Sequence, residues 1–141
     1  MTSKSSNDRM RVQATRESFV EAPAWLLDLG WSRQSRPSIS PGREYAAYGL
    51  SVWRGSTSFL VIDDDNMPRF LPAWLFRQVD SSMPPGWICS CFEGEVTMVI
   101  GPAFIAESVE AYTDLVELVP DQVRRFREYV QSLTGDQDAV V

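Results

Sequence analysis

Few side chains in this 141-residue sequence combine in patterns that support catalysis. Histidine is absent, so the chain lacks the commonest general acid/base and the partner that Ser–His and Cys–His nucleophile pairs require. The run from Gly49 to Trp53 begins like a nucleophile elbow around Ser51, but the final glycine and a preceding strand are missing. We therefore predict a non-enzymatic protein with no catalytic residues and no cofactor.

The two cysteines, Cys89 and Cys91, are separated by a single serine. A structural zinc site needs four ligands, and this chain offers two thiols and no imidazole. A disulfide between positions i and i+2 of a strand would strain the backbone. We expect two small buried thiols on one face of a strand, and no metal site.

Three consecutive aspartates, Asp63, Asp64 and Asp65, follow an apolar run and resemble the start of a calcium loop. A helix–loop–helix calcium loop needs glycine at its sixth position and glutamate at its twelfth, where this chain has Pro68 and Trp74. Two interpretations remain: a solvated turn that protects a strand end, or an acidic binding patch.

Acidic residues dominate the sequence from this turn onward. Between Asp63 and Asp121 there are eleven acidic residues and two basic ones. Five of the acidic residues recur at spacings of 3, 4, 3 and 4, which on one helix would form a stripe: Glu107, Glu110, Asp114, Glu117 and Asp121. Such a stripe is either a solvated helix face or, without interleaved lysine or arginine, the source of a sizeable field.

Trp53 adds an aromatic side chain to this acidic region. It shares a predicted strand face with small residues, where a tryptophan lies either under a second layer of structure or exposed as an anchor. We predict that a partner binds the aspartates, this tryptophan and nearby carboxylates. The predicted partner-binding residues are Asp63, Asp64, Asp65, Trp53, Glu93, Glu95, Glu110, Asp114 and Glu117.

The composition restricts the class of partner. Thirteen basic and nineteen acidic residues give a formal net charge of −6, which argues against nucleic acid, because nucleic-acid binding needs a basic surface. No segment approaches the roughly 20 apolar residues of a membrane helix, and the N-terminus lacks the apolar run of a secretory signal. We therefore expect a cytoplasmic protein, no membrane association and a basic protein as partner.

A β-hairpin over residues 45–65 is the centre of the predicted fold. Residues 48, 50 and 52 share one face, the turn falls at residues 54–57, and four apolar residues at 59–62 are typical of a strand covered on both faces. A second hairpin is predicted from Trp87 to Ile100, with Val96, Met98 and Ile100 on one face.

Helices are predicted around this sheet. Short helices begin at Pro23 and Pro72, the second with Leu75, Phe76 and Val79 on one face. A longer helix runs from Pro120 to Gly135, and its apolar face consists of Val123, Phe126, Val130 and Leu133. Residues 105–119 fit a helix, although a strand at 115–119 stays open.

The predicted fold class is α+β. It has an antiparallel sheet of four or five strands, a C-terminal helix on one face and short helices that begin at prolines. Residues 1–16 are polar and lack periodicity, so we expect a flexible N-terminal tail, followed by a single domain over residues 17–141.

The block YGLSVWRG…FLVIDDD and the helix PDQVRRFREYV resemble, in layout, small cytoplasmic bacterial immunity proteins, which neutralise toxins in interbacterial competition. The resemblance implies a cognate basic toxin, blocked at or near its active site, and no catalysis by this chain. Two alternatives stay open. One is a carboxylate-dependent enzyme or an accessory subunit of one, and the other is an inhibitor from a virus or mobile element that mimics nucleic acid.

Overall fold

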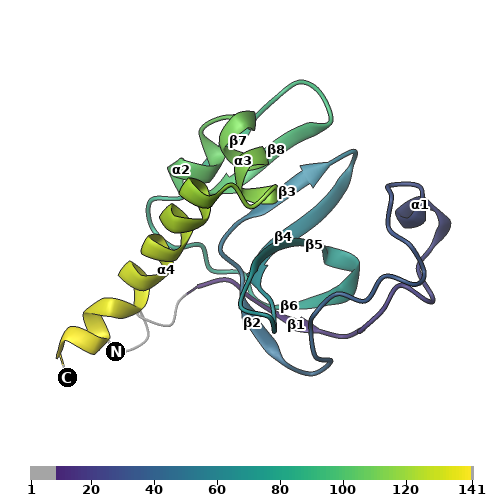
Figure 1. The fold of residues 1–141 in the computed structure, drawn as a ribbon, viewed down its shortest axis with the longest axis horizontal. Helices are drawn as coiled ribbons and strands as arrows, with labels where there is room; N and C mark the ends of the chain where they lie inside the picture. Colours follow the sequence, from purple (N-terminus) through teal and green to yellow (C-terminus); the bar gives the residue numbers. More distant parts are fainter. Residues whose placement is uncertain (1–8, 141) are drawn as a thin grey trace.

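The chain folds around two antiparallel β-sheets (Figure 1). The computed structural model describes residues 9–140, with side chains up to Leu133. The larger sheet has the strand order β5-β4-β3-β8-β7, and the smaller has the order β2-β1-β6. The elements are β1 (Arg11–Ala14), α1 (Ala24–Leu27), β2 (Glu44–Ala46), β3 (Leu50–Trp53), β4 (Ser56–Ile62), β5 (Pro68–Pro72), the 3-10 helix η2 (Ala73–Leu75), β6 (Phe76–Asp80), β7 (Ile88–Cys91), β8 (Val96–Gly101), α2 (Ala103–Ala106), α3 (Val109–Val116) and α4 (Pro120–Val140). The predicted α+β class, with an antiparallel sheet of five strands and a C-terminal helix, is confirmed.

The predicted central hairpin is formed by β3 and β4. Its turn consists of Arg54 (φ 48°) and Gly55 (φ 80°), because a two-residue hairpin turn with both central residues left-handed matches the twist of the strands. Strand β4 lies between β3 and β5 and is buried on both sides, as predicted. Phe59 and Val61 belong to one apolar cluster and Leu60 to another, so we call these two sides the N-terminal face and the helical face.

The three-stranded sheet and the N-terminal segment cover part of the N-terminal face. Met10, Val12 and Ala14 are buried in the same cluster as Phe59 and Val61. The prediction of a tail through residue 16 is therefore wrong for this strand, while residues 1–8 lie outside the described residues. Buried and exposed residues alternate along β1, but the charged residues among them made this segment look like a polar tail. Arg11, which lies between buried Met10 and Val12, forms ion pairs at the sheet surface.

Helices α2, α3 and α4 cover the helical face, and α1 lies on the opposite side of the molecule (Figure 1). Phe126 is fully buried there, with Val123, Val130 and Leu133 packed around the same cluster, which confirms the predicted apolar stripe. The helix continues past Gly135 to Val140, so the predicted end is wrong. Among the described residues, no helix combines the length and the hydropathy needed to cross a bilayer.

Segment 66–80 departs from the prediction. Residues 68–72 form the edge strand β5, and the second proline-initiated helix is a single 3-10 turn. The predicted helical face of Leu75, Phe76 and Val79 is wrong, because residues from Phe76 onward extend to pair with β1. Pairing with a distant strand outweighs the local helical spacing here.

Strand β8 contains a bulge that divides its predicted face. Val52 pairs with Met98 and Trp53 with Val96, so Thr97 is the extra residue. Val96 therefore packs in the cluster on the helical face, and the prediction that it shares a face with Met98 is wrong. The outer strand β7 has one sheet neighbour, and both of its cysteines are exposed rather than buried.

Candidate functional site

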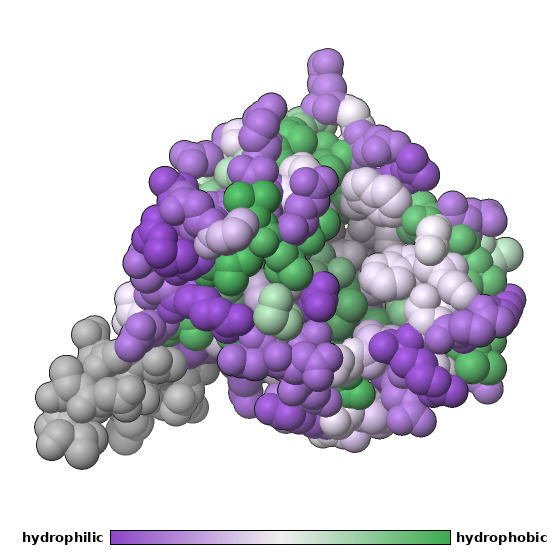
Figure 2. All heavy atoms as spheres, viewed as in Figure 1, coloured by the Kyte–Doolittle hydropathy of each residue, from purple (hydrophilic) through white to green (hydrophobic). Residues whose placement is uncertain are grey.

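A groove of about 730 Å³ opens where the helices leave part of the helical face uncovered. On the surface in Figure 2, apolar and aromatic residues gather around a central hollow that is bordered by hydrophilic ones. We call this hollow the aromatic groove. The residues that line it are Leu29, Gly30, Trp31, Trp53, Ser56, Ser58, Phe70, Glu93, Gly94, Glu95, Val96, Val109, Tyr112, Thr113 and Val116.

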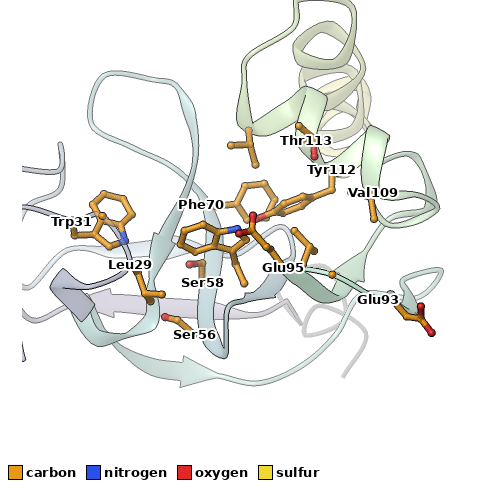
Figure 3. Close-up of a pocket in the computed structure, with 15 residues that line it drawn as sticks. Leu29, Trp31, Ser56, Ser58, Phe70, Glu93, Glu95, Val109, Tyr112 and Thr113 are labelled. Atoms are coloured by element: carbon orange, nitrogen blue, oxygen red, sulfur yellow. The ribbon is translucent and has the colours of Figure 1, made fainter. Parts of the chain in front are cut away.

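The groove is built from segments far apart in the sequence (Figure 3). Trp31 stands on one side, and Tyr112, Val109 and Thr113 of helix α3 stand on the other, with Phe70 of β5 between them. The hairpin β3–β4 supplies Trp53 and two serines to the floor. Because apolar and aromatic side chains predominate, the groove suits an apolar group of a ligand or partner.

Trp31 owes its position to a stack of aromatic rings. Its ring lies 4.8 Å from that of buried Phe19, with an interplanar angle of 17°, and Phe19 also stacks on Trp74 at 6.0 Å. At the far end of the stack, the Arg16 guanidinium lies over the Trp74 ring, 4.1 Å from its centroid. This stack therefore fixes the position of Trp31 in the loop after α1. Sequence reasoning missed this residue.

A hydrogen bond and a ring contact hold Tyr112 of α3 in place. Its hydroxyl is hydrogen-bonded to the Ser51 hydroxyl at 3.1 Å, and both residues are buried. The Phe70 ring meets it edge-on at 4.8 Å. Burial raises the pKa of Tyr112, partly offset by the Ser51 hydrogen bond, so its hydroxyl stays neutral at physiological pH. Ser51 is thus a structural partner on the helical face.

Trp53 and Glu95 both line the groove and are connected through Arg54. The Arg54 guanidinium stacks over the Trp53 ring at 4.8 Å and donates from Nε to the Glu95 carboxylate at 2.9 Å. Both charged side chains are about half exposed, so this ion pair adds little to stability. Trp53 is half-buried, and the loop from Leu29 to Trp31 lines the same groove.

A smaller hollow of about 370 Å³ continues the groove toward the aspartate turn. It shares Trp31, Phe70 and Val116 with the aromatic groove, and its lining includes Asp63 and Asp65. Two arginines line it as well, Arg36 and Arg69. The two hollows together bring Trp53 and Glu95 onto the same surface as the aspartate turn.

Asp63 has a structural role in this turn. Its carboxylate accepts hydrogen bonds from the backbone N–H of Asp65 at 2.9 Å and of Met67 at 3.0 Å, and Arg69 Nε lies 3.4 Å away. Its side chain is 4% exposed, which leaves almost no surface for a partner. The aspartate side chain thus supplies the acceptor that closes the turn.

Asp64 is engaged as well. Its carboxylate accepts hydrogen bonds from the hydroxyls of Ser40 and Tyr45 and from Arg43. The Ser40 hydrogen bond above all, followed by those of Tyr45 and Arg43, holds the pKa of Asp64 below its usual value despite partial burial. The carboxylates of Asp63 and Asp64 thus have separate partners within the fold. Asp65 is exposed, and no hydrogen bond to its side chain is found among the described residues.

The predicted acidic stripe is divided between elements. Glu107 ends α2, Asp121 lies in α4, and only Glu110, Asp114 and Glu117 belong to α3 and its C-cap. These three are exposed and lie about 100° around the helix from the side chains that line the groove. The strand left open at residues 115–119 is not formed: α2 ends at Ala106, α3 spans Val109–Val116, and a turn follows it.

The acidic residues outnumber the basic ones around the groove. The two hollows and the flanking side of α3 contain six exposed carboxylates, on Asp65, Glu93, Glu95, Glu110, Asp114 and Glu117, besides the buried Asp63. Three arginines accompany them, on Arg36, Arg54 and Arg69. The imbalance makes this surface attractive to a cationic partner. Of the nine predicted partner-binding residues, Asp64 alone belongs neither to the two hollows nor to α3.

Among the described residues, no group of three or more His, Cys, Asp or Glu side chains is arranged to hold a metal ion. Comparison found no family model that matches the chain, no curated protein similar to it in sequence and no solved structure that matches its fold. The groove is therefore the feature of the molecule from which a function can be inferred.

Proposed function

We propose that this protein is a stoichiometric binding module for a basic protein. It would take an apolar side chain of the partner into the aromatic groove and pair the flanking basic residues of that partner with the acidic rim. The observation that supports this proposal most directly is the convergence of Trp31, Trp53, Phe70 and Tyr112 on one open hollow.

The physical reason is the distribution of binding energy in protein interfaces. Buried aromatic anchors contribute most of it, and complementary charges at the rim steer the encounter. Trp53 is half-buried and Val116 is 47% exposed, so part of this apolar surface remains available to a partner. A toxin neutralised by an immunity protein, the class that the layout resembles, fits this description of the partner.

The first candidate partner is a basic protein encoded by a reading frame next to this one. Its affinity for the wild-type chain, Trp53→Ala and Trp25→Ala should be measured by titration calorimetry. Trp25 is the matched control, because it is 54% exposed in α1 and does not line the groove. Loss of a central anchor costs about 2 kcal/mol or more, so Trp53→Ala should weaken binding at least about 30-fold.

Selection of displayed random peptides against the immobilised chain tests the proposal without an identified partner. We expect enrichment of sequences with an aromatic or aliphatic residue flanked by lysine or arginine, which bind wild type and Trp25→Ala but not Trp53→Ala. Peptides that bind all three proteins equally would place the interface elsewhere. Urea unfolding of each variant separates lost binding from lost folding.

A further inference from the structure

We propose that Cys89, Cys91 and Met98 form a binding site for Cu(I) on the face of the large sheet opposite the aromatic groove. The sequence alone favoured buried, inert thiols at these positions. In the structure both cysteines are exposed on the outer strand β7, so their sulfur atoms are accessible to a metal ion. The proposal is independent of the proposed function.

Strand register brings the three sulfur-containing residues together. Cys89 pairs with Ile100 and Cys91 with Met98, and paired residues project from the same side of a sheet. Leu50 pairs with both Ile100 and Phe59, which identifies this side as the N-terminal face. Residues i and i+2 of a strand also share a face, so all three side chains lie on that one surface.

Cys91 and Met98 form the closer kind of antiparallel pair. The Phe92 N–H donates to the Thr97 carbonyl at 2.9 Å, so the hydrogen bonds lie beside the Cys91–Met98 pair rather than within it. In such a pair the Cα atoms are about 4.5 Å apart and the side chains are closest. The side chains of Met98 and Cys91 therefore start from backbone positions at the closest spacing that paired strands provide.

The two thiols have a spacing that suits a metal of low coordination number. Along a strand, Cys89 and Cys91 are separated by about 6.6 Å. Two metal–thiolate bonds of about 2.3 Å, together with the Cβ–S bonds, span this distance with the sulfurs on opposite sides of the ion. The Met98 thioether can then supply a third sulfur ligand.

The chemistry of this donor set selects Cu(I) over zinc. Thiolate and thioether sulfur are soft ligands, which favour Cu(I), and a structural zinc site requires four ligands. The described residues provide no carboxylate or imidazole cluster that would complete a zinc site here. The neighbours Val52 and Ile100 on the same face are apolar and half-buried, which limits the access of harder ligands.

The test is an anaerobic titration of the reduced full-length chain with Cu(I) in competition with bicinchoninate. We expect one copper per chain, and X-ray absorption that shows only sulfur neighbours around the copper. Cys89→Ser and Cys91→Ser should each abolish this binding. Met98→Leu should weaken it by about tenfold or more, the loss that even outer-shell partners of a metal cause. Met83→Leu is the matched control, since Met83 is 53% exposed and lies outside this face.

Several results would overturn the proposal. If Met98→Leu and wild type bind Cu(I) with equal affinity, Met98 is not a ligand. If Cu(I) binding survives either cysteine substitution, the proposed site does not exist. One copper shared by two chains, detected by mass spectrometry across protein concentrations, would mean that the site is not formed within one chain. Stoichiometric zinc that excess Cu(I) does not displace would contradict the predicted selectivity. Circular dichroism of each variant confirms that the fold is intact.

Discussion

Asp64 should stabilise the fold, and replacing it with alanine should lower the free energy of unfolding by about 2–3 kcal/mol. Its carboxylate accepts hydrogen bonds from Ser40 Oγ at 2.6 Å, from the Tyr45 hydroxyl at 2.8 Å and from Arg43 Nη1 at 2.8 Å. Hydrogen bonds to a charged acceptor contribute about 1.5–3 kcal/mol each, and solvent around the Asp64 side chain, which is 24% exposed, reduces the total to about 2–3 kcal/mol. The Arg43 side chain is 60% exposed, so its pair adds little, and the two hydroxyls account for most of the effect.

The Tyr45 hydroxyl limits the loss. It also accepts a hydrogen bond from the Ser40 N–H at 2.8 Å, so it is not left without a partner when the Asp64 carboxylate is removed. Asp64→Asn should cost less than Asp64→Ala, because the amide oxygen can still accept from Tyr45 and Arg43. The three proteins are compared by urea unfolding at pH 7, where a single domain allows two-state analysis.

The pH dependence gives a second test of the same contact. Because the folded-state pKa of Asp64 lies below its ordinary value of 3.8, its contribution is present above pH 3.8 and is lost as pH falls through the folded-state pKa. The stability difference between wild type and Asp64→Ala should therefore narrow in acid. Asp65→Ala is the control, since its exposed side chain has no contact of this kind among the described residues. Equal effects of the two substitutions at pH 7, or a difference that persists unchanged below pH 3, would refute the reasoning.

Three further predictions concern stability, and each is measured by chemical unfolding. Phe126→Ala should cost about 3–5 kcal/mol, because the ring is fully buried and packs edge-on against Tyr48 at 5.5 Å; an unchanged transition would place the helix elsewhere. Burial raises the pKa of Tyr112, so the free energy of unfolding should be constant up to about pH 10 and decrease above it. Tyr112→Phe should make this decrease smaller. If wild type and Tyr112→Phe show the same dependence of unfolding free energy on pH, the burial of the hydroxyl does not affect stability. Gly49→Ala should cost about 1–3 kcal/mol, because its Cβ would lie 3.0 Å from the Ile100 carbonyl oxygen, and a neutral effect would show that the strands move apart readily.

Local apolar patterns predicted the centre of the fold. The run of four apolar residues that ends at Ile62 indicated a strand covered on both faces, and the stripe around Phe126 indicated the helix that covers one of them. Strands β1 and β6 were missed because each pairs with a strand far along the chain, whereas β5 pairs with the neighbouring β4 but begins and ends at prolines. Arg11, for example, pairs with Asp80, and the local sequence around neither residue predicts a strand.

The candidate site was predicted in part, for a similar reason. Trp53, Glu93 and Glu95 are identifiable as single residues near a hairpin, but a groove requires a second wall. That wall includes Trp31, which is held by the Phe19 stack between segments twelve residues apart, and no local pattern reports such a contact. The sequence shows that the three aspartates are adjacent, but it does not show the separate hydrogen-bond partners of Asp63 and Asp64.

The two proposed binding surfaces should be separable by mutation, because strand alternation places them on opposite faces of one sheet. On β3, Trp53 and Ser51 project toward the helical face, whereas Val52 pairs with Met98 on the other. Because of the bulge in β8, Val96 lies on the helical face although it is two residues from Met98, which lies on the other face. Trp53→Ala should therefore leave copper binding unchanged, and Met98→Leu should leave binding of a protein or peptide partner unchanged. If either substitution impaired both functions, the surfaces would be coupled through the sheet and neither effect could be assigned to direct contact.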